Sequence, residues 1–356
     1  MFGLNILAKV RKKNNLSFQL ATWAAEYYEF CEQDSKMIFY ESRDGKNMVD
    51  SPKAIFEYMM NHERYKEYTH VWSFDPAVDN WENIIDFYQE QTNVLFVERN
   101  TQEYVKYLYE SKFLITNATF QSFFIPRKDQ VVINTWHGTP LKKMGFDIKD
   151  SNPAGPQNVI RNFLFSNYLI SPNRHTTNMY LNSFKLDGLY QGEILEAGYP
   201  RIDLMHKTTL ESEVKKLKEL SLNVNLDKKT VLYCPTWKGK DVNNPTSELN
   251  QIISESKFLQ SHIGSEYNLL VKVHPFIYDA AKEIDEFRGF LVPDSYDPNE
   301  LMVAIDLLVT DYSSIFFDFM LTDKPILFYC WDKDLYENDR GLYISEDKLP
   351  GPVATT

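Results

Sequence analysis

The sequence predicts an α/β protein built of two Rossmann-like domains that face each other across a cleft. Short apolar runs rich in β-branched residues alternate with helical patterns along the 356 residues, as in a parallel, doubly wound sheet. A charged segment over residues 203–226 interrupts this alternation, and a second series starts at Thr230. A chain of this length can bury two separate cores. We therefore expect an N-terminal domain over residues 1–205 and a C-terminal domain over residues 206–356.

Composition limits the classes of function. With 38 Lys and Arg against 50 Asp and Glu, the formal net charge is −12, which argues against a nucleic-acid-binding protein held by bulk electrostatics. The three cysteines have no metal-type spacing, and an odd number suits a reducing compartment. No apolar run approaches the roughly 20 residues that span a bilayer, and the N-terminus lacks the apolar core of a signal peptide. These features predict a soluble, cytoplasmic protein.

The first series of elements begins with an aromatic-rich amphipathic helix over residues 17–31. We expect this helix to pack on the core, and contact with a membrane or a partner is the alternative. The strands expected after it are residues 37–40, 70–74, 94–97, 113–116, 131–134, 168–171 and 194–197. The helices expected between them are residues 51–60, 101–109, 158–165 and 173–184. Ser51 is the expected cap of the first of these helices, and Pro52 its first residue.

The second series predicts another sheet of the same kind. Its expected strands are residues 231–235, 269–274, 290–292, 307–310 and 326–329. The lysine-rich run at 210–220 is better explained as a solvated helix face than as a binding patch. Two such domains in one chain are the layout of the GT-B glycosyltransferase fold.

The stretch from Val131 to Gly145 carries the first candidate site. Its apolar strand ends in a run of small and polar residues, and ligands of open α/β sheets bind beyond the carboxyl ends of the strands, so His137 would lie where chemistry occurs. Gly138 allows a ligand to approach the backbone closely, and Lys142 adds positive charge. A polar, Pro- and Gly-containing stretch at 147–157 predicts a mobile loop beside this site. From these residues alone, a surface loop with a solvated histidine is an equally good interpretation.

Two strand ends in the second series carry further candidates. Thr236 follows the strand at 231–235. Lys272 and His274 lie two residues apart, so on an extended strand they would share a side and suit a diphosphate. A capped histidine beside a solvated lysine is the alternative.

The strongest local pattern is an apolar strand at 307–310 that runs into Ser313 and Ser314 and then an apolar helix. Helix N-termini present free N–H groups and the positive end of the helix dipole, which bind phosphate. Asp318 lies one helical turn after Ser314 and could accept hydrogen bonds from a ribose or polyol. An ordinary N-cap explains one serine well, but two serines with Asp318 less well.

These motifs, in the order NTWHGTPLK, GYPR, YCPTW, KVHP, TDYSSIFFDF and KPILFY, together resemble the CDP-glycerol glycerophosphotransferase family. That family contains the teichoic-acid primases and polymerases and related capsule-polymer enzymes. The resemblance covers roughly residues 113–353, and residues 340–341 and 349–352 continue it. It implies a GT-B fold, a CDP-polyol donor held mostly by the C-terminal domain, and CMP as a product. Residues before about 113 match no family motif, and members normally continue beyond the last residue here, so we expect the C-terminal domain to be truncated.

The resemblance also implies roles for individual residues. His137 is similar to the proposed general base, and His274, also expected to be catalytic, to a diphosphate-binding residue. The expected donor-binding residues are Lys272, Thr236, Thr310, Ser313, Ser314, Asp318 and Arg340. The expected acceptor-side residues are Gly138, Thr139 and Lys142. No carboxylate cluster calls for a metal, and we expect no cofactor.

The sequence thus predicts a phosphotransferase of the EC 2.7.8 type. It would move glycerol phosphate or ribitol phosphate from a CDP-polyol to a hydroxyl on a glycan or lipid-linked polymer, in teichoic-acid or capsule-type synthesis. We expect no nucleic-acid partner, and the alternative to a freely soluble protein is peripheral contact with the inner face of the cell membrane. The alternative functions are a nucleotide-sugar 2-epimerase, an ordinary GT-B glycosyltransferase and a catalytically silent nucleotide-binding module.

Overall fold

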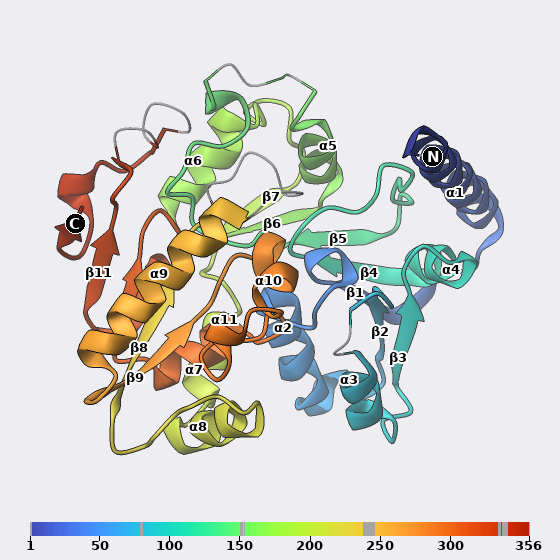
Figure 1. The fold of residues 1–356 in the computed structure, drawn as a ribbon. Coiled ribbons are helices and arrows are strands. Elements are labelled where there is room, and N and C mark those ends of the chain that lie inside the picture. The colour runs from blue at the N-terminus through green and yellow to red at the C-terminus, as the bar shows by residue number, and fades with distance from the viewer. Residues whose placement is uncertain are drawn as a thin grey trace. The chain divides into compact units, whose positions relative to one another are not determined.

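The chain forms two compact units, each built around one parallel sheet. The computed structural model describes residues 2–78, 81–149, 152, 154–237, 246–333, 336 and 341–355, with the backbone alone at 2–14 and 246–248. Unit 1 comprises Met1–His137 and Asn152–Arg201, and unit 2 comprises Gly138–Ser151 and Ile202–Thr356. The segment directly after His137 therefore packs with the second unit (Figure 1).

Unit 1 contains a seven-stranded sheet in the order β3-β2-β1-β4-β5-β6-β7, in which every pairing is parallel. Its strands are β1 (Asp34–Glu41), β2 (Thr69–Phe74), β3 (Val94–Glu98), β4 (Ser111–Thr116), β5 (Val131–Asn134), β6 (Tyr168–Ser171) and β7 (Glu193–Glu196). The strand order reverses between β1 and β4. In doubly wound sheets the ligand crevice lies at such a reversal, beyond the carboxyl ends of the strands.

Helices cover both faces of this sheet. They are α1 (Phe2–Phe30), α2 (Asp50–Met60), α3 (Trp81–Tyr88), α4 (Gln102–Glu110), α5 (Gln157–Phe165) and α6 (Arg174–Ser183). Alternate residues of β1 point to opposite faces, so Phe39 joins one core, with Leu20 of α1, and Tyr40 joins the other, with Phe56 of α2. The helix expected at 17–31 therefore packs on the core as predicted, although it begins at Phe2 and lies beside α4 (Figure 1).

Two expectations for unit 1 concern the cap of α2 and the loop at 147–157. The Ser51 cap is wrong, because α2 begins at Asp50, its N-cap position is Val49, and the Ser51 backbone N–H donates to Asp50 Oδ1 (2.6 Å). The loop expected at 147–157 falls partly outside the described residues, and its first residue ends a 3₁₀ turn, Gly145–Asp147.

Unit 2 contains a five-stranded sheet in the order β12-β11-β10-β8-β9, again with parallel pairings. Its strands are β8 (Lys229–Cys234), β9 (Tyr267–Val271), β10 (Leu307–Thr310), β11 (Ile326–Tyr329) and β12 (Val353–Ala354). Its helices are α7 (Ile202–Lys207), α8 (Leu210–Glu219), α9 (Thr246–Ile263), α10 (Pro275–Ala281), α11 (Pro298–Leu301) and α12 (Ile315–Phe319). One core packs α8, α11 and α12 on the sheet, and the other packs α9 and α10.

Two strand expectations for unit 2 are wrong. Strand β9 ends at Val271, before Lys272 and His274, because the chain turns there into α10 with Pro275 in its first turn. Residues 290–292 form no strand, although Leu291 makes a single parallel bridge with Val271. The α/β class and the two parallel sheets are confirmed.

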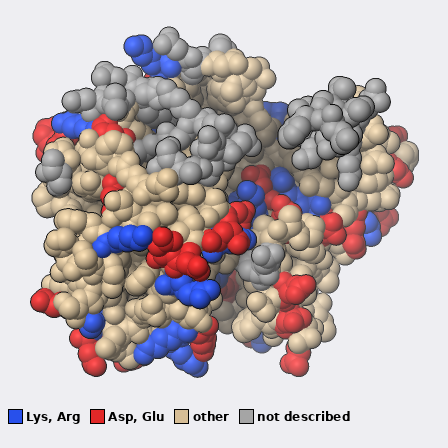
Figure 2. All heavy atoms as spheres, in the orientation of Figure 1, with Lys and Arg blue, Asp and Glu red and all other residues tan. Residues whose placement is uncertain are grey.

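The described surface has no bulk basic character. Figure 2 shows Lys and Arg side chains interspersed with Asp and Glu on the face in view, in keeping with the net charge of −12. Among the described residues, no helix combines the length and the apolar character needed to cross a membrane.

Candidate functional site

The carboxyl edge of the unit 1 sheet brings together segments that are far apart in the chain. β1 leads into a turn, Arg43–Gly45, and then into Asp50; β4 leads into Asn117; β5 leads into His137. β1 and β4 flank the point where the strand order reverses, and β5 lies next to β4. His137 therefore lies where doubly wound sheets carry their ligands.

A backbone carbonyl orients the His137 ring. His137 Nδ1 lies 2.9 Å from the carbonyl oxygen of Asn117. A carbonyl can only accept, so Nδ1 carries the proton in this hydrogen bond and Nε2 of the neutral ring keeps its lone pair. The ring also lies against the indole of Trp136, with 4.1 Å between the centroids. The structure thus holds His137 in the tautomer that a general base requires at Nε2.

Trp136 adopts an unusual backbone conformation that aims His137. Its φ is +53°, in the left-handed region that bulky residues rarely adopt. Its N–H donates to Asn134 Oδ1 (2.9 Å), and its buried ring packs edge-on against Phe163 and Phe184. The packing and the hydrogen bond hold a conformation that costs about 1–2 kcal/mol.

An ion pair lies next to Asn117. Asp50 and Arg201, with side chains 13% and 7% exposed, approach within 3.3 Å. Asp50 also accepts from Ser51 N–H and from Asn117 Nδ2 (2.9 Å). Burial by itself would raise the pKa of the Asp50 carboxyl, but Arg201 and these hydrogen bonds outweigh burial and leave the pKa lowered. Asp50 is therefore ionised at neutral pH.

The same charges act on His137. His137 is exposed, yet enough protein surrounds its ring for desolvation to lower its pKa. The Asn117 hydrogen bond and the Asp50 charge oppose this effect, whereas Arg201 and Arg43 add to it. His137 is consequently neutral, and able to accept a proton, at neutral pH.

The sequence analysis missed Asp50, Asn117 and Arg201. Arg201 ends the GYPR motif, which was the one available signal, and it stacks on Tyr199 with 4.4 Å from Cζ to the ring centroid. Asp50 and Asn117 looked like ordinary residues beside a helix and a strand. Only the strand order brings them together.

The three residues expected on the acceptor side belong to unit 2. Gly138 and Thr139 are buried. Lys142 forms an antiparallel bridge with Leu342, and its ammonium lies 5.7 Å from the ring centroid of Tyr336.

On the unit 2 sheet, His274 caps α10. Its Nδ1 accepts from the Phe276 N–H (3.2 Å), so in the neutral ring the proton lies on Nε2, which can donate to a phosphate oxygen. Lys272 is 8% exposed and donates from Nζ to the Pro293 carbonyl (2.9 Å). The expectation that Lys272 and His274 share a side of an extended strand is wrong, because the strand ends at Val271.

Thr236 and Thr310 lie at neighbouring strand ends. The Thr236 N–H donates to Asp311 Oδ1 (2.9 Å), and its hydroxyl oxygen is buried with no hydrogen-bond partner in the described part of the chain. Thr236 lines a small hollow together with Asp311 and Trp331. Thr310 is fully buried, and its hydroxyl already donates to the Cys234 carbonyl (2.7 Å).

The serine turn leads into α12, which is short. Ser313 and Ser314 are half-buried, Ser313 Oγ accepts from Ile315 N–H (3.4 Å), and the N-cap residue Ser314 makes no side-chain cap. Asp318 is 7% exposed and accepts from Asn299 Nδ2 (3.2 Å), which ties α12 to α11. Arg340 lies outside the described residues.

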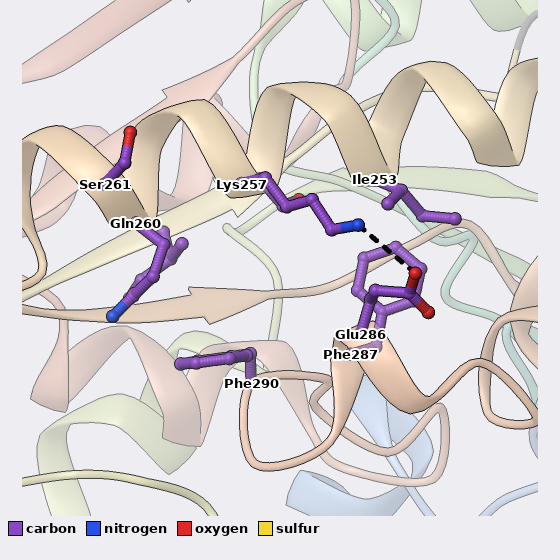
Figure 3. Close-up of a pocket in the computed structure, with 9 residues that line it drawn as sticks. Ile253, Lys257, Gln260, Ser261, Glu286, Phe287 and Phe290 are labelled. Carbon is purple, nitrogen blue, oxygen red and sulfur yellow. Dashed lines mark hydrogen bonds and ion pairs between the residues drawn. The ribbon is translucent and has the colours of Figure 1, made fainter.

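Two other features bear on the choice of site. In the described ranges, no three His, Cys, Asp or Glu residues gather as a metal site would need. Figure 3 shows a pocket of about 200 Å³ in unit 2, between α9 and residues 286–290, where Lys257 and Glu286 form an ion pair (3.2 Å). Leu269, in the middle of β9, lines this pocket, and no expected site residue does.

Comparison with known proteins gives consistent matches. The family model described as "CDP-Glycerol:Poly(glycerophosphate) glycerophosphotransferase" matches residues 25–356. The teichoic acid poly(glycerol phosphate) polymerase of Bacillus spizizenii is 32% identical over 91% of this chain and 82% of its own length. The polymerase of the same description from Staphylococcus epidermidis is 32% identical over 90% of this chain, which spans only 44% of that relative. A solved structure of the wall teichoic acid polymerase TagF matches with a TM-score of 0.77 and 29% identity, over 99% of this chain and 86% of its own.

Proposed function

Because this chain belongs to the CDP-glycerol:poly(glycerophosphate) glycerophosphotransferase family, we propose that it transfers a polyol-phosphate unit from a CDP-polyol to an acceptor hydroxyl and releases CMP. The unit is glycerol phosphate or ribitol phosphate, and the acceptor is a glycan or lipid-linked polymer of the teichoic-acid or capsule type. The observation that carries this proposal is His137, whose Nδ1 is bound by the Asn117 carbonyl so that Nε2 is available as a base.

The proposed reaction is an in-line substitution at phosphorus. His137 Nε2 takes the proton of the acceptor hydroxyl as its oxygen attacks the β-phosphorus of the donor. The bond from that phosphorus to the bridging oxygen breaks, and the oxygen leaves on CMP. A positioned general base contributes about 10²–10⁴-fold to such a step. Orientation of the acceptor and stabilisation of charge on the phosphate oxygens supply the remainder.

We assign the acceptor side to the N-terminal domain and the donor side to the C-terminal domain. His274 Nε2–H would donate to the diphosphate, since Nδ1 is already used by the Phe276 N–H. Ser313 and Ser314, half-buried before α12, would add hydroxyl donors. The buried Thr236 hydroxyl supports a polar contact at the same edge of the sheet. Lys272, Asp318, Arg340 and the acceptor-side residues Gly138, Thr139 and Lys142 are assigned from the family motifs alone.

A product assay tests this function. CDP-glycerol and CDP-ribitol are each incubated with synthetic polyol-phosphate acceptors, and CMP release is measured together with acceptor mass. We expect CMP in equimolar amount with the polyol phosphate added. An epimerase would release no CMP, and a silent nucleotide-binding module would bind donor without turnover. The epimerase alternative is not favoured, because the family model and the relatives are phosphotransferases.

We also propose that the protein works in the cytoplasm, at the inner face of the cell membrane. Phe18 and Phe30 of α1 are each 74% exposed, and the same helix carries the basic residues Lys9, Arg11, Lys12 and Lys13. A helix that combines exposed aromatic side chains with a basic segment of sequence can lie on an anionic lipid surface. Flotation with phosphatidylglycerol vesicles should carry the protein upward, and neutral vesicles should not. Equal flotation with both, or with neither, contradicts this placement.

A further inference from the structure

The Asn117 carbonyl that binds His137 Nδ1 is itself held in place by neighbouring residues. Asn117 lies just after β4, is 1% exposed, and both ends of its side-chain amide are bound. Its Oδ1 accepts from the Arg43 N–H (2.9 Å), and its Nδ2 donates to Asp50 Oδ2 (2.9 Å). The residue that orients the base is therefore itself held by the loop that follows β1.

Asp50 has the properties of a fixed anchor. Its backbone φ is +67°, in the region where Asp and Asn are tolerated better than other side chains. Its carboxylate is ion-paired with Arg201 at 3.3 Å and also accepts from Ser51 N–H. These bonds use both carboxylate oxygens and leave little rotational freedom. Asp50 and Asn117 are 67 residues apart in the chain, so neither is explained by local turn formation.

We infer that Asp50 is a positioning residue for transfer, which acts through Asn117 to hold His137 with its proton on Nδ1, while Arg201 holds Asp50 in place. Asp50 would touch neither donor nor acceptor. This inference rests on the proposed function of His137 as general base. It predicts a loss in kcat with little change in the KM for the donor, because the donor site is assigned to other residues.

The main variant is Asp50→Gly, which removes the carboxylate at a position where φ is positive and glycine fits. We expect kcat to fall about 10- to 100-fold, as it does on loss of residues that orient the ligands of a catalytic metal. Asp50→Asn keeps one oxygen, which can accept from Asn117 Nδ2 while the new NH₂ group lies toward the Ser51 N–H, so we expect it to recover part of that loss. Asn117→Ala removes the link from the other side while keeping the carbonyl, and should lower kcat as Asp50→Gly does.

The tautomer of His137 distinguishes positioning from a purely structural role. If Asp50 and Asn117 only stabilised the fold, replacing them would leave this tautomer unchanged. The protein contains seven histidines, so ¹⁵N-histidine labelling gives a small set of signals, and those of His137 are assigned by their loss in His137→Gln. Wild-type protein should show the proton on Nδ1, and Asp50→Gly and Asn117→Ala a mixture of both tautomers. An unchanged His137 spectrum in both folded variants overturns the inference, even if kcat falls.

A matched control comes from another Arg–carboxylate pair of unit 1. Arg174 and Glu196 are also 3.3 Å apart, but the structure gives them no bond to Asn117 or His137. Glu196→Ala should leave kcat and the tautomer unchanged. If His137→Gln keeps wild-type turnover, the proposed general base fails. If His137→Gln is inactive while Asp50→Gly and Asn117→Ala turn over normally, this inference alone fails.

Discussion

At the scale of single residues, the proposed chemistry depends on His137 as the general base. His137→Gln keeps a polar side chain of similar reach but no basic nitrogen, so we expect turnover to fall by about 10²–10⁴-fold. Donor affinity, measured by calorimetry with CDP-glycerol, should stay within about twofold, since unit 1 is assigned to the acceptor. A parallel loss of donor affinity would make His137 a donor ligand instead.

The pH profile offers an independent check on His137. A general base works only when neutral, so activity is lost as pH falls through the pKa of the folded state. Desolvation lowers that pKa, so the acid limb of kcat/KM should lie below pH 6.5, the ordinary value for histidine. An acid limb at or above pH 6.5 would contradict the neutral, partly desolvated ring seen here.

His70 affects stability instead of catalysis. It is fully buried beside Tyr40, and desolvation lowers its pKa to about 4. Between pH 6.5 and 4 the unfolded chain binds a proton that the folded chain does not, so stability falls as pH falls, by about 3 kcal/mol in total. Urea unfolding at pH 7, 5.5 and 4.5 should show a smaller pH-dependent loss for His70→Gln than for wild type. Equal losses would mean that His70 titrates normally.

At the scale of elements, we expect the hydroxyl of Thr310 in β10 to stabilise the fold and the hydroxyl of Ser313 in the next turn to bind the donor. Thr310 is fully buried and bonded to the Cys234 carbonyl, so Thr310→Val should cost about 1 kcal/mol of stability. CDP-glycerol affinity should be unchanged in that variant. Ser313→Ala, three residues on and half-buried, should weaken CDP-glycerol more than CMP at unchanged stability. If Thr310→Val weakens CDP-glycerol binding and Ser313→Ala does not, Thr310 is a donor-binding residue.

Some helices and strands could be predicted from the sequence, and others could not. Apolar runs predicted most strands of both sheets, and the helical pattern at 101–109 predicted α4 to within one residue. The pattern failed where chain direction depends on tertiary context: residues 269–273 are all buried, Lys272 included, but β9 stops at Val271. Strand β12 has two residues and no periodicity to detect. The hydrophobic pattern of a sequence reports which residues are buried. Residues can stay buried after the last hydrogen bond of a strand, so the pattern does not locate the strand end.

The candidate site was predictable only where one short segment carries it. His137 follows a visible strand, and His274 precedes a visible proline. The cluster of Asp50, Asn117 and Arg201 joins segments up to 151 residues apart, and each of them is an ordinary polar residue in its local sequence. Their convergence depends on the strand order, which composition and periodicity do not determine.

At the scale of the whole molecule, the two histidines that we propose for the reaction are held in opposite tautomers. Nδ1 of His137 donates to a carbonyl, whereas Nδ1 of His274 accepts from a backbone N–H. One ring is therefore set to receive a proton at Nε2 and the other to donate there. A base paired with a donor to phosphate suits attack at phosphorus. Glycoside chemistry uses two carboxylates flanking a carbon, and none of the expected site residues of either unit forms such a pair.

Isotope labelling follows that argument to the bond that breaks. A CDP-glycerol carrying ¹⁸O in the bridge between glycerol and the β-phosphate should deliver the label, with the phosphate, into the polymer, because attack at the β-phosphorus leaves that bridge intact. Mass spectrometry of the polymer and of the released nucleotide measures this directly, with ¹⁸O in the diphosphate bridge as the matched control that should appear in CMP. Release of CDP that carries the ¹⁸O of the glycerol–phosphate bridge would mean attack at the glycerol carbon. A hydrogen bond from His274 to the diphosphate would not explain that reaction.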